Sequence, residues 1–234
     1  MSRKSEVFNE DCMIGMRRYP DKYFDLAVVD PPYGIGESGG KNKTRGLLTK
    51  AKDYKPFFGK DLEPPGKEYF SELARVSKNQ IIFGANHFAD RLVNPSSSCW
   101  LVWDKENGET DFADCELAYT SFNNAVRIFR FRWNGMLQGN MKRKEVRIHP
   151  TQKPVALYAW IFQNYAKPGQ KILDTHMGSQ SSRIAAYEAN LEFTGFEIDK
   201  TYFDIGNERF ETHISQMSFF HMDEIEERRS QTSL

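Results

Sequence analysis

The amino-acid sequence predicts an α/β fold built on a mostly parallel, doubly wound sheet. Short apolar segments rich in β-branched residues alternate with longer segments of helical periodicity, which is the pattern of strand–helix–strand units. Three of the apolar segments end on an acid, at Asp30, Asp174 and Glu197. Ligands of open α/β sheets bind outside the carboxyl ends of the strands, so these acids mark the expected site.

Each element follows from a local pattern of residue types. Strands are predicted where apolar runs are short, at residues 25–30, 80–85, 99–104, 116–122, 126–133, 171–174 and 192–198. Helices are predicted where apolar residues recur with helical spacing, at residues 65–77, 154–166, 179–190 and 199–215. The segment 154–166 opens with proline, which the first helical turn tolerates. We expect the 234 residues to form a single domain.

The composition excludes several classes of protein. The net charge is zero, so any binding to nucleic acid must come from local basic patches. The three cysteines form no Cys-x-x-Cys pair, and His213 and His221 have no partners at metal spacing. We therefore expect no metal site and a reduced, intracellular compartment. The N-terminus lacks an apolar signal region and no apolar run approaches about 18 residues, so we expect a cytoplasmic protein without a membrane span.

Two segments differ from the alternating pattern. Residues 34–60 are rich in glycine and lysine and are expected to form a mobile basic loop, which carries Lys41, Lys43 and Arg45. Residues 123–148 form the second segment, whose cations are Arg127, Arg130, Arg132, Lys142, Arg143, Lys144 and Arg147, against the single acid Glu145. Strand alternation places the arginines opposite Phe129, Phe131 and Trp133, with a small bulge or twist at Arg127. The segment is either a contact for a polyanion or an amphipathic hairpin with a solvated basic face.

The stretch "KILDTHMGSQSS" at residues 171–182 has the pattern of a strand, a tight turn and a helix N-terminus. Such a junction presents backbone N–H groups to a ligand, and an acid about 20 residues later typically binds ribose hydroxyls. The turn has no lysine, no GxxxxGK[ST] and no GxGxxG, which disfavours a triphosphate or a dinucleotide. A cofactor with a ribose and a charged amino acid but no phosphate fits better, and S-adenosylmethionine has that description.

The motifs together resemble the DNA amino-methyltransferases, which transfer methyl from S-adenosylmethionine to adenine N6 or cytosine N4. The resemblance rests on "DPPY" at 30–33, "HPTQKP" at 149–154, "ILDTHMGSQSS" and "FTGFEID", and it covers residues 9–209. The catalytic motif precedes the cofactor loop, an order similar to the circularly permuted β class. The resemblance therefore implies the Rossmann-like fold of S-adenosylmethionine-dependent methyltransferases. It also implies double-stranded DNA as the partner, a role in restriction–modification and pairing of two copies.

The predicted catalytic residues are Asp30, Pro31, Pro32 and Tyr33. The exocyclic amino group of adenine is a poor nucleophile because its lone pair is delocalised into the ring. The Asp30 carboxylate and the Pro31 carbonyl, held by the locked φ of proline, are expected to accept its two hydrogens. Tyr33 offers a flat face for the base. A base within a duplex must be flipped out to reach this clamp.

The resemblance assigns the other functional residues one by one. Asp11 matches an acid near the cofactor adenine and Glu197 the ribose partner, while Thr151 and Lys153 lie in the element expected near the cofactor carboxylate. The predicted cofactor-binding residues are Asp11, Cys12, Asp30, Thr151, Lys153, Asp174, His176, Gly178, Ser179, Glu197 and Ile198. The predicted DNA-binding residues are Lys41, Lys43, Arg45, Arg130, Arg132, Lys142, Arg143 and Lys144. Residues 123–148 are expected to form a small target-recognition insert.

Two alternatives stand beside an adenine-specific enzyme. Asp at the first catalytic position favours adenine N6 in this family, whereas Ser is typical of cytosine N4, so cytosine is the first alternative. His176 replaces the usual phenylalanine and Gln180 a usual glycine of the cofactor loop. These departures motivate the second alternative, a catalytically silent DNA-binding relative.

Overall fold

The computed structural model describes residues 4–36, 61–108, 113–134, 137–142 and 144–231, with side chains for all of these except residues 134 and 218–231. Its main sheet has eight strands in the order β1-β10-β9-β2-β3-β5-β4-β6. In that order the strands are Ser5–Phe8, Glu192–Phe196, Lys171–Asp174, Phe24–Val29, Ser77–Phe83, Cys115–Thr120, Trp100–Asp104 and Arg127–Arg130. The first five are parallel, and β5 runs antiparallel to both β3 and β4. The predicted α/β fold class with a mostly parallel sheet is confirmed.

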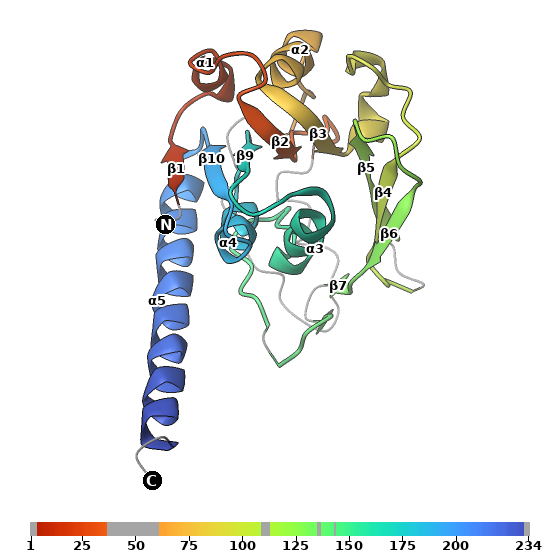
Figure 1. Cartoon of the computed structure of the whole chain (residues 1–234). Helices are drawn as coiled ribbons and strands as arrows, with labels where there is room; N and C mark the ends of the chain where they lie inside the picture. Colours follow the sequence, from red (N-terminus) through yellow and green to blue (C-terminus); the bar gives the residue numbers. More distant parts are fainter. Residues whose placement is uncertain (1–3, 37–60, 109–112, 135–136, 143, 232–234) are drawn as a thin grey trace.

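Helices cover both faces of the sheet (Figure 1). The helices α1 (Cys12–Met16) and α2 (Lys67–Val76) lie on one face, and α3 (Val155–Tyr165) and α4 (Ser181–Glu188) on the other. The long helix α5 (Lys200–Gln231) starts beside α4 and extends past the rest of the described chain. Among the described residues, no helix combines the length and apolarity needed to cross a bilayer.

Burial on both faces explains why residues 26–29 of the central strand β2 form a continuous apolar run, whereas Asp25 near its start is half-buried and pairs with Lys78. Leu26 and Val28 belong to the hydrophobic cluster under α3 and α4, whereas Ala27 and Val29 belong to the cluster under α1 and α2. Successive side chains of a strand point to opposite faces, so a strand buried on both faces must be apolar at every position. On α2, the buried residues Tyr69, Phe70, Leu73 and Val76 form the helical stripe that faces the sheet.

The structure corrects several predicted boundaries. The single strand predicted at 126–133 is two strands, β6 and β7 (Trp133–Asn134), and β7 pairs with β8 (Leu137–Gln138) in a separate sheet. The reason is that β4, the partner of β6, ends at Asp104, where the Phe131 N–H donates to the Asp104 carbonyl. Sequence periodicity did not predict β1, α1 or β8, which are too short to show a period. The helix predicted at 199–215 continues to Gln231.

Candidate active site

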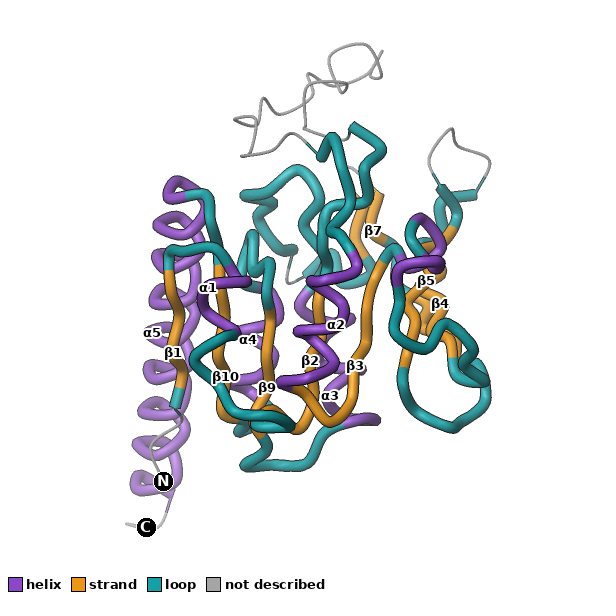
Figure 2. The backbone as a smooth tube through the Cα atoms, turned by 90° about the horizontal axis from the view of Figure 1, so that it is seen from above, coloured by secondary structure: helices purple, strands orange, loops and turns teal. Residues whose placement is uncertain are grey.

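The parallel strands bring the three strand-end acids to one edge of the sheet. Asp30 follows β2, Asp174 ends β9 and Glu197 follows β10, and these strands are neighbours in register. Their carboxyl ends face the upper edge in Figure 2, where several connecting loops gather. The three strand-end acids therefore lie at the same edge of the sheet.

The Asp30 carboxylate is held by two side chains. The Tyr33 hydroxyl donates to Oδ1 at 2.6 Å, and the Lys153 ammonium donates to Oδ2 at 2.5 Å. Burial raises the pKa of Asp30 above its ordinary value, and the cation of Lys153 opposes this effect. A carboxylate offers about four acceptor positions, so Asp30 retains capacity for a substrate N–H.

A second carboxylate, Glu116, completes this ionic cluster. It is the second residue of the antiparallel strand β5, and its Oε2 lies 3.0 Å from the Lys153 ammonium while its Oε1 lies 2.5 Å from that of Lys105. Although burial acts to raise it, the two cations lower the pKa of Glu116 to about 2. Sequence analysis missed Glu116 and Lys105, because an isolated acid on β5 and an isolated lysine just after β4 carry no motif.

The Tyr33 ring packs against the turn after β3. It stacks on His87 with centroids 5.2 Å apart and planes 16° from parallel. Gly84 has φ +68°, and a Cβ atom there would overlap the Tyr33 ring, so glycine is needed for both reasons. One face of Tyr33 therefore lies against His87, and its role as a platform for a base stays a prediction.

The turn between β9 and α4 is tied to the end of β10. The Gly178 N–H donates to Oε2 of Glu197 at 2.8 Å, and the Asp199 N–H donates to Oε1 at 2.9 Å. Asp174 accepts from the His176 N–H at 3.0 Å and from the Ser182 hydroxyl at 2.5 Å. Burial raises the pKa of Asp174 to about 7.

A buried hydrogen-bonded chain connects α2 to this turn. The Tyr69 hydroxyl and the Thr175 hydroxyl are 2.6 Å apart, and Thr175 Oγ1 lies 2.9 Å from Nδ1 of His176. Burial lowers the pKa of His176 to about 4, so its ring is neutral at pH 7. Tyr69 was not predicted as a site residue, because its place on the apolar stripe of α2 indicates only core packing.

The remaining predicted cofactor residues lie around the same turn. Asp11 caps α1, accepting from the Met13 N–H at 2.7 Å, and burial raises the pKa of the adjacent Cys12 thiol to about 12. Asn9 donates to the carbonyls of Glu197 and Ile198, so the ends of β1 and β10 meet.

The side chains of two further predicted residues, Thr151 and Lys153, point to different parts of the site. The Thr151 hydroxyl lies 3.1 Å from Nδ1 of His149, the ring of which packs on Gly178. Lys153, two residues later, points to Asp30 instead. Ser179 is buried, and its carbonyl accepts from Arg209 at 2.6 Å.

Gln180, which stands where the family usually has a glycine, does not direct its side chain into the turn. Gln180 has φ +59° and is fully buried, with its amide directed at α4 and α5: Nε2 donates to the carbonyl of Phe203 and to Asn207, and Oε1 accepts from Arg183 at 2.8 Å. Gly206 provides the space for the Gln180 side chain, because a Cβ atom at Gly206 would lie 2.7 Å from Cγ of Gln180. The Gln180 side chain therefore points away from the turn.

The basic segment has the alternation that its sequence predicts. Arg130 and Arg132 are exposed, whereas Trp133 is buried and Phe129 and Phe131 pack against the core. Arg130 lies 3.4 Å from the Asp104 carboxylate. Lys142 and Lys144 are exposed, while Lys41, Lys43, Arg45 and Arg143 lie outside the described residues.

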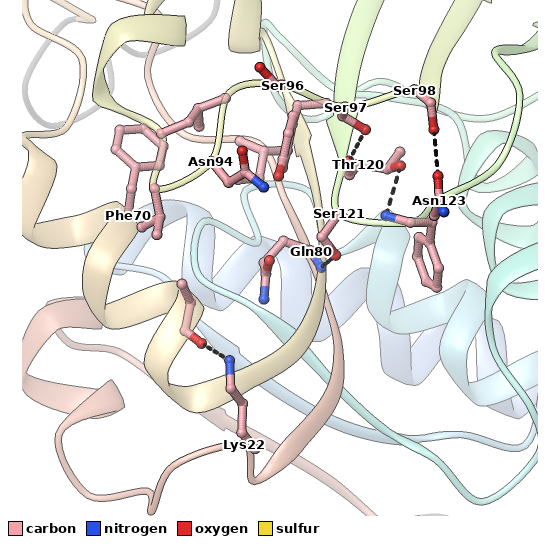
Figure 3. A pocket seen from close by; sticks show the side chains of 16 residues that line it. Lys22, Phe70, Gln80, Asn94, Ser96, Ser97, Ser98, Thr120, Ser121 and Asn123 are labelled. Carbon is pink, nitrogen blue, oxygen red and sulfur yellow. Dashed lines mark hydrogen bonds between the residues drawn. The ribbon is translucent and has the colours of Figure 1, made fainter.

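A cavity of about 430 Å³ lies beside α2, β3 and β5 (Figure 3). Its walls come from α2, β3, the end of β5 and the residues before β4, including Lys22, Gln80, Ser97 and Thr120. The residues predicted for the site and described here are absent from its lining. The cavity is thus separate from the strand-end acids.

Comparisons with known proteins agree with this arrangement. The family model N6_N4_Mtase, described as DNA methylase, matches residues 88–208. The chain is 24% identical to the type II methyltransferase M.HpaI of Haemophilus parainfluenzae, over 91% of this chain and 74% of that protein. Its fold is similar to that of the M1.HpyAVI–SAM complex, with TM-score 0.55, 20% identity and coverage of 87% and 98% of the two chains. It is also similar to the PvuII DNA methyltransferase, which is cytosine-N4-specific, with TM-score 0.57, 12% identity and coverage of 90% and 87%. With the family model matching more than half of its length, the chain belongs to the N6/N4 DNA methylase family.

Proposed function

We propose that this chain transfers the methyl group of S-adenosylmethionine to N6 of a flipped-out adenine in double-stranded DNA. Membership of the DNA methylase family supports the methyl transfer to DNA. The observation that carries the choice of adenine is the carboxylate of Asp30 at the end of β2, ion-paired to the buried Lys153. A carboxylate rather than a hydroxyl at this position is typical of the adenine-specific members that the catalytic motif resembles.

The chain's own residues support a cofactor of this chemistry. Asp174, which is buried, and Glu197, which is half-buried, lie at the turn after β9, where the Gly178 N–H donates to Glu197. Carboxylates fit ribose hydroxyls and a cationic amino acid, whereas they repel phosphate. When bound, S-adenosylmethionine supplies an activated methyl group. We assign its binding to Asp11, Cys12, Thr151, Asp174, His176, Gly178, Ser179, Glu197 and Ile198.

In the proposed mechanism Asp30 and the Pro31 carbonyl each accept one hydrogen of the adenine amino group. Fixed acceptors at this nitrogen favour the pyramidal form, with the lone pair directed at the methyl carbon. Holding the two reactants together contributes the proximity effect. The nitrogen becomes acidic as it gains the methyl group, so its proton leaves without a strong base, and Asp30 is suited to receive it transiently.

The DNA contacts are assigned to exposed cations. Arg130, Arg132, Lys142 and Lys144 are exposed on the segment 123–148, which we propose as the target-recognition insert. We propose the same role for Arg143 of this segment and for Lys41, Lys43 and Arg45 of the loop 34–60. Such cations grip phosphates or read guanine edges.

The test is transfer of tritiated methyl from S-adenosylmethionine to double-stranded DNA, followed by analysis of the methylated base. We expect N6-methyladenine. The variant Asp30→Ala should abolish transfer and leave cofactor binding nearly intact, as calorimetry would show. A product of only N4-methylcytosine would move the assignment to the cytosine enzymes, to which the PvuII neighbour belongs. DNA binding without any S-adenosylmethionine binding would instead identify a catalytically silent relative.

A further inference from the structure

Lys153 lies where two functional motifs meet. It belongs to "HPTQKP" just before α3, yet its ammonium is within hydrogen-bonding distance of three oxygens: Asp30 Oδ2 at 2.5 Å, Tyr33 Oη at 3.1 Å and Glu116 Oε2 at 3.0 Å. Its side chain is only 4% exposed. The family resemblance placed Lys153 near the cofactor carboxylate, but its contacts are with the catalytic motif.

We propose that Lys153 and Glu116 are positioning residues, in which Lys153 holds the Asp30 carboxylate ionised and in one orientation and Glu116 holds Lys153 in place. This inference rests on the proposed function, because it assigns the acceptor role to Asp30. Lys153 does not touch the reacting atoms in this account and acts through Asp30.

The orientation of Asp30 follows from its two donors. Tyr33 binds one carboxylate oxygen and Lys153 the other, so rotation of the carboxylate would break both hydrogen bonds. The Lys153 ammonium is itself confined between aromatic rings, 4.8 Å from the centroid of Phe83 and 5.5 Å from that of Tyr33. These contacts leave the acceptor lone pairs of Asp30 in a fixed direction.

The ionisation of Asp30 depends on the balance of charges around it. Asp30 and Glu116 are two buried carboxylates, and Lys153 lies between them with Lys105 on the outer side of Glu116. The titratable groups that face Asp30 directly are Tyr33, Lys153 and Glu116, and more distant electrostatic partners are Asp174, Tyr69 and Tyr158. A like charge disfavours ionisation and an opposite charge favours it. Removing Lys153 should therefore make Asp30 harder to ionise, and removing the charge of Glu116 should make it easier.

These opposite signs provide the test. We compare Lys153→Met and Glu116→Gln with the unmodified protein by titrating the Asp30 carboxyl carbon in ¹³C NMR, and by measuring single-turnover methyl transfer against pH. In Lys153→Met the NMR midpoint and the acid limb of the rate profile should move to higher pH, and in Glu116→Gln to lower pH. The rate at pH 7 in Lys153→Met should fall by up to about 100-fold, because the acceptor is misplaced as well as harder to ionise. The dissociation constant for S-adenosylmethionine should stay unchanged.

A matched control lies where β2 and β3 begin. Lys78 pairs with Asp25 at 2.7 Å, at the opposite end of β2, and its side chain is half-exposed. Lys78→Met removes an ion pair of the same kind without facing Asp30, so neither the titration nor the rate profile should move.

The outcomes separate this inference from the proposed function. A weaker affinity for S-adenosylmethionine in Lys153→Met with no movement of the Asp30 titration would overturn the inference and return Lys153 to the cofactor. Equal shifts of the same sign in both variants would also overturn it, since general damage to the site has no reason to produce opposite signs. If Lys153→Met does not fold, the inference is decided by Glu116→Gln alone, in which the NMR midpoint of Asp30 should move to lower pH. If the wild-type product is N4-methylcytosine, the proposed function fails, while the NMR titration still decides the positioning role.

Discussion

The carboxylate of Glu197 accepts a hydrogen bond from the backbone N–H of Gly178 at 2.8 Å, and thereby joins the turn after β9 to the end of β10. Its second oxygen accepts from the Asp199 N–H at 2.9 Å. One side chain thus sets the shape of the turn and also presents the acid that we assign to the cofactor ribose. Both functions depend on an ionised group with two acceptor oxygens.

The first prediction concerns this carboxylate. Glu197→Gln should weaken S-adenosylmethionine binding by about 10- to 100-fold, because hydrogen bonds to a charged group contribute about 1.5–3 kcal/mol. Titration calorimetry measures the change. Glu192→Gln, at the start of the same strand, is the control and should bind the cofactor as the wild type does. Equal affinities in the two variants would contradict the assignment of Glu197.

The second prediction concerns pH. Burial raises the pKa of Asp174 from its ordinary 3.8 to about 7, so between these values the folded protein binds a proton that the unfolded chain has released. The free energy of unfolding should therefore fall as pH rises from about 4 to about 7. Asp30, Glu145 and Glu197 have pKa values shifted in the same direction by burial, so the measurement must isolate Asp174.

Denaturant unfolding of the wild type and of Asp174→Asn across this range isolates it. The difference in the free energy of unfolding between the two proteins should change steadily between pH 4 and pH 7 and become constant above pH 7. A difference that is independent of pH throughout would show that Asp174 has an ordinary pKa in the folded protein.

The third prediction concerns the unusual glutamine of the turn. Gln180 occupies a left-handed conformation and directs its amide at Arg183 and Asn207 rather than at the turn. Gln180→Gly should leave S-adenosylmethionine affinity unchanged and lower stability by about 1 kcal/mol, because the lost hydrogen bonds exceed the relief of backbone strain.

The matched variant is at Gly206, where an added Cβ atom would lie 2.7 Å from Cγ of Gln180. Gly206→Ala should be destabilising in the wild type and tolerated in the Gln180→Gly background, which thermal unfolding of the double-mutant cycle would show. Additive losses would mean that the two residues are not coupled.

The fourth prediction concerns the basic segment. Removing Arg132 and Lys144 together should reduce the slope of log affinity for DNA against log salt by about 2, since each phosphate contact contributes about 0.9. Fluorescence anisotropy at several salt concentrations measures the slope. The control is Lys167→Ala, which removes an exposed lysine from the turn before β9, away from the basic segment. This variant should leave the salt slope unchanged. A slope that does not respond to Arg132 and Lys144 would favour the solvated hairpin.

Much of the fold follows from local patterns. The strand Lys171–Asp174 has the predicted bounds, and β2, β4, α2 and α3 agree within about two residues, because each carries its own apolar period or helix signal. The break between β6 and β7 was not predicted, because it depends on where the neighbouring strand β4 ends. The short elements β1 and β8 exist only through their partners in the sheets.

The sequence by itself determined the α/β class, the three acids at strand ends, the order of the motifs and the alternation of arginines with aromatic residues. These are properties of neighbouring residues, and parallel strands bring their ends together whatever the details of packing. Only the tertiary structure decided that Lys153 pairs with Asp30, that Glu116 and Lys105 complete the cluster, and that Gln180 points to α5. Lys153 and Asp30 are 123 residues apart, and their contact depends on the directions in which side chains leave two separate elements. No local pattern carries that information.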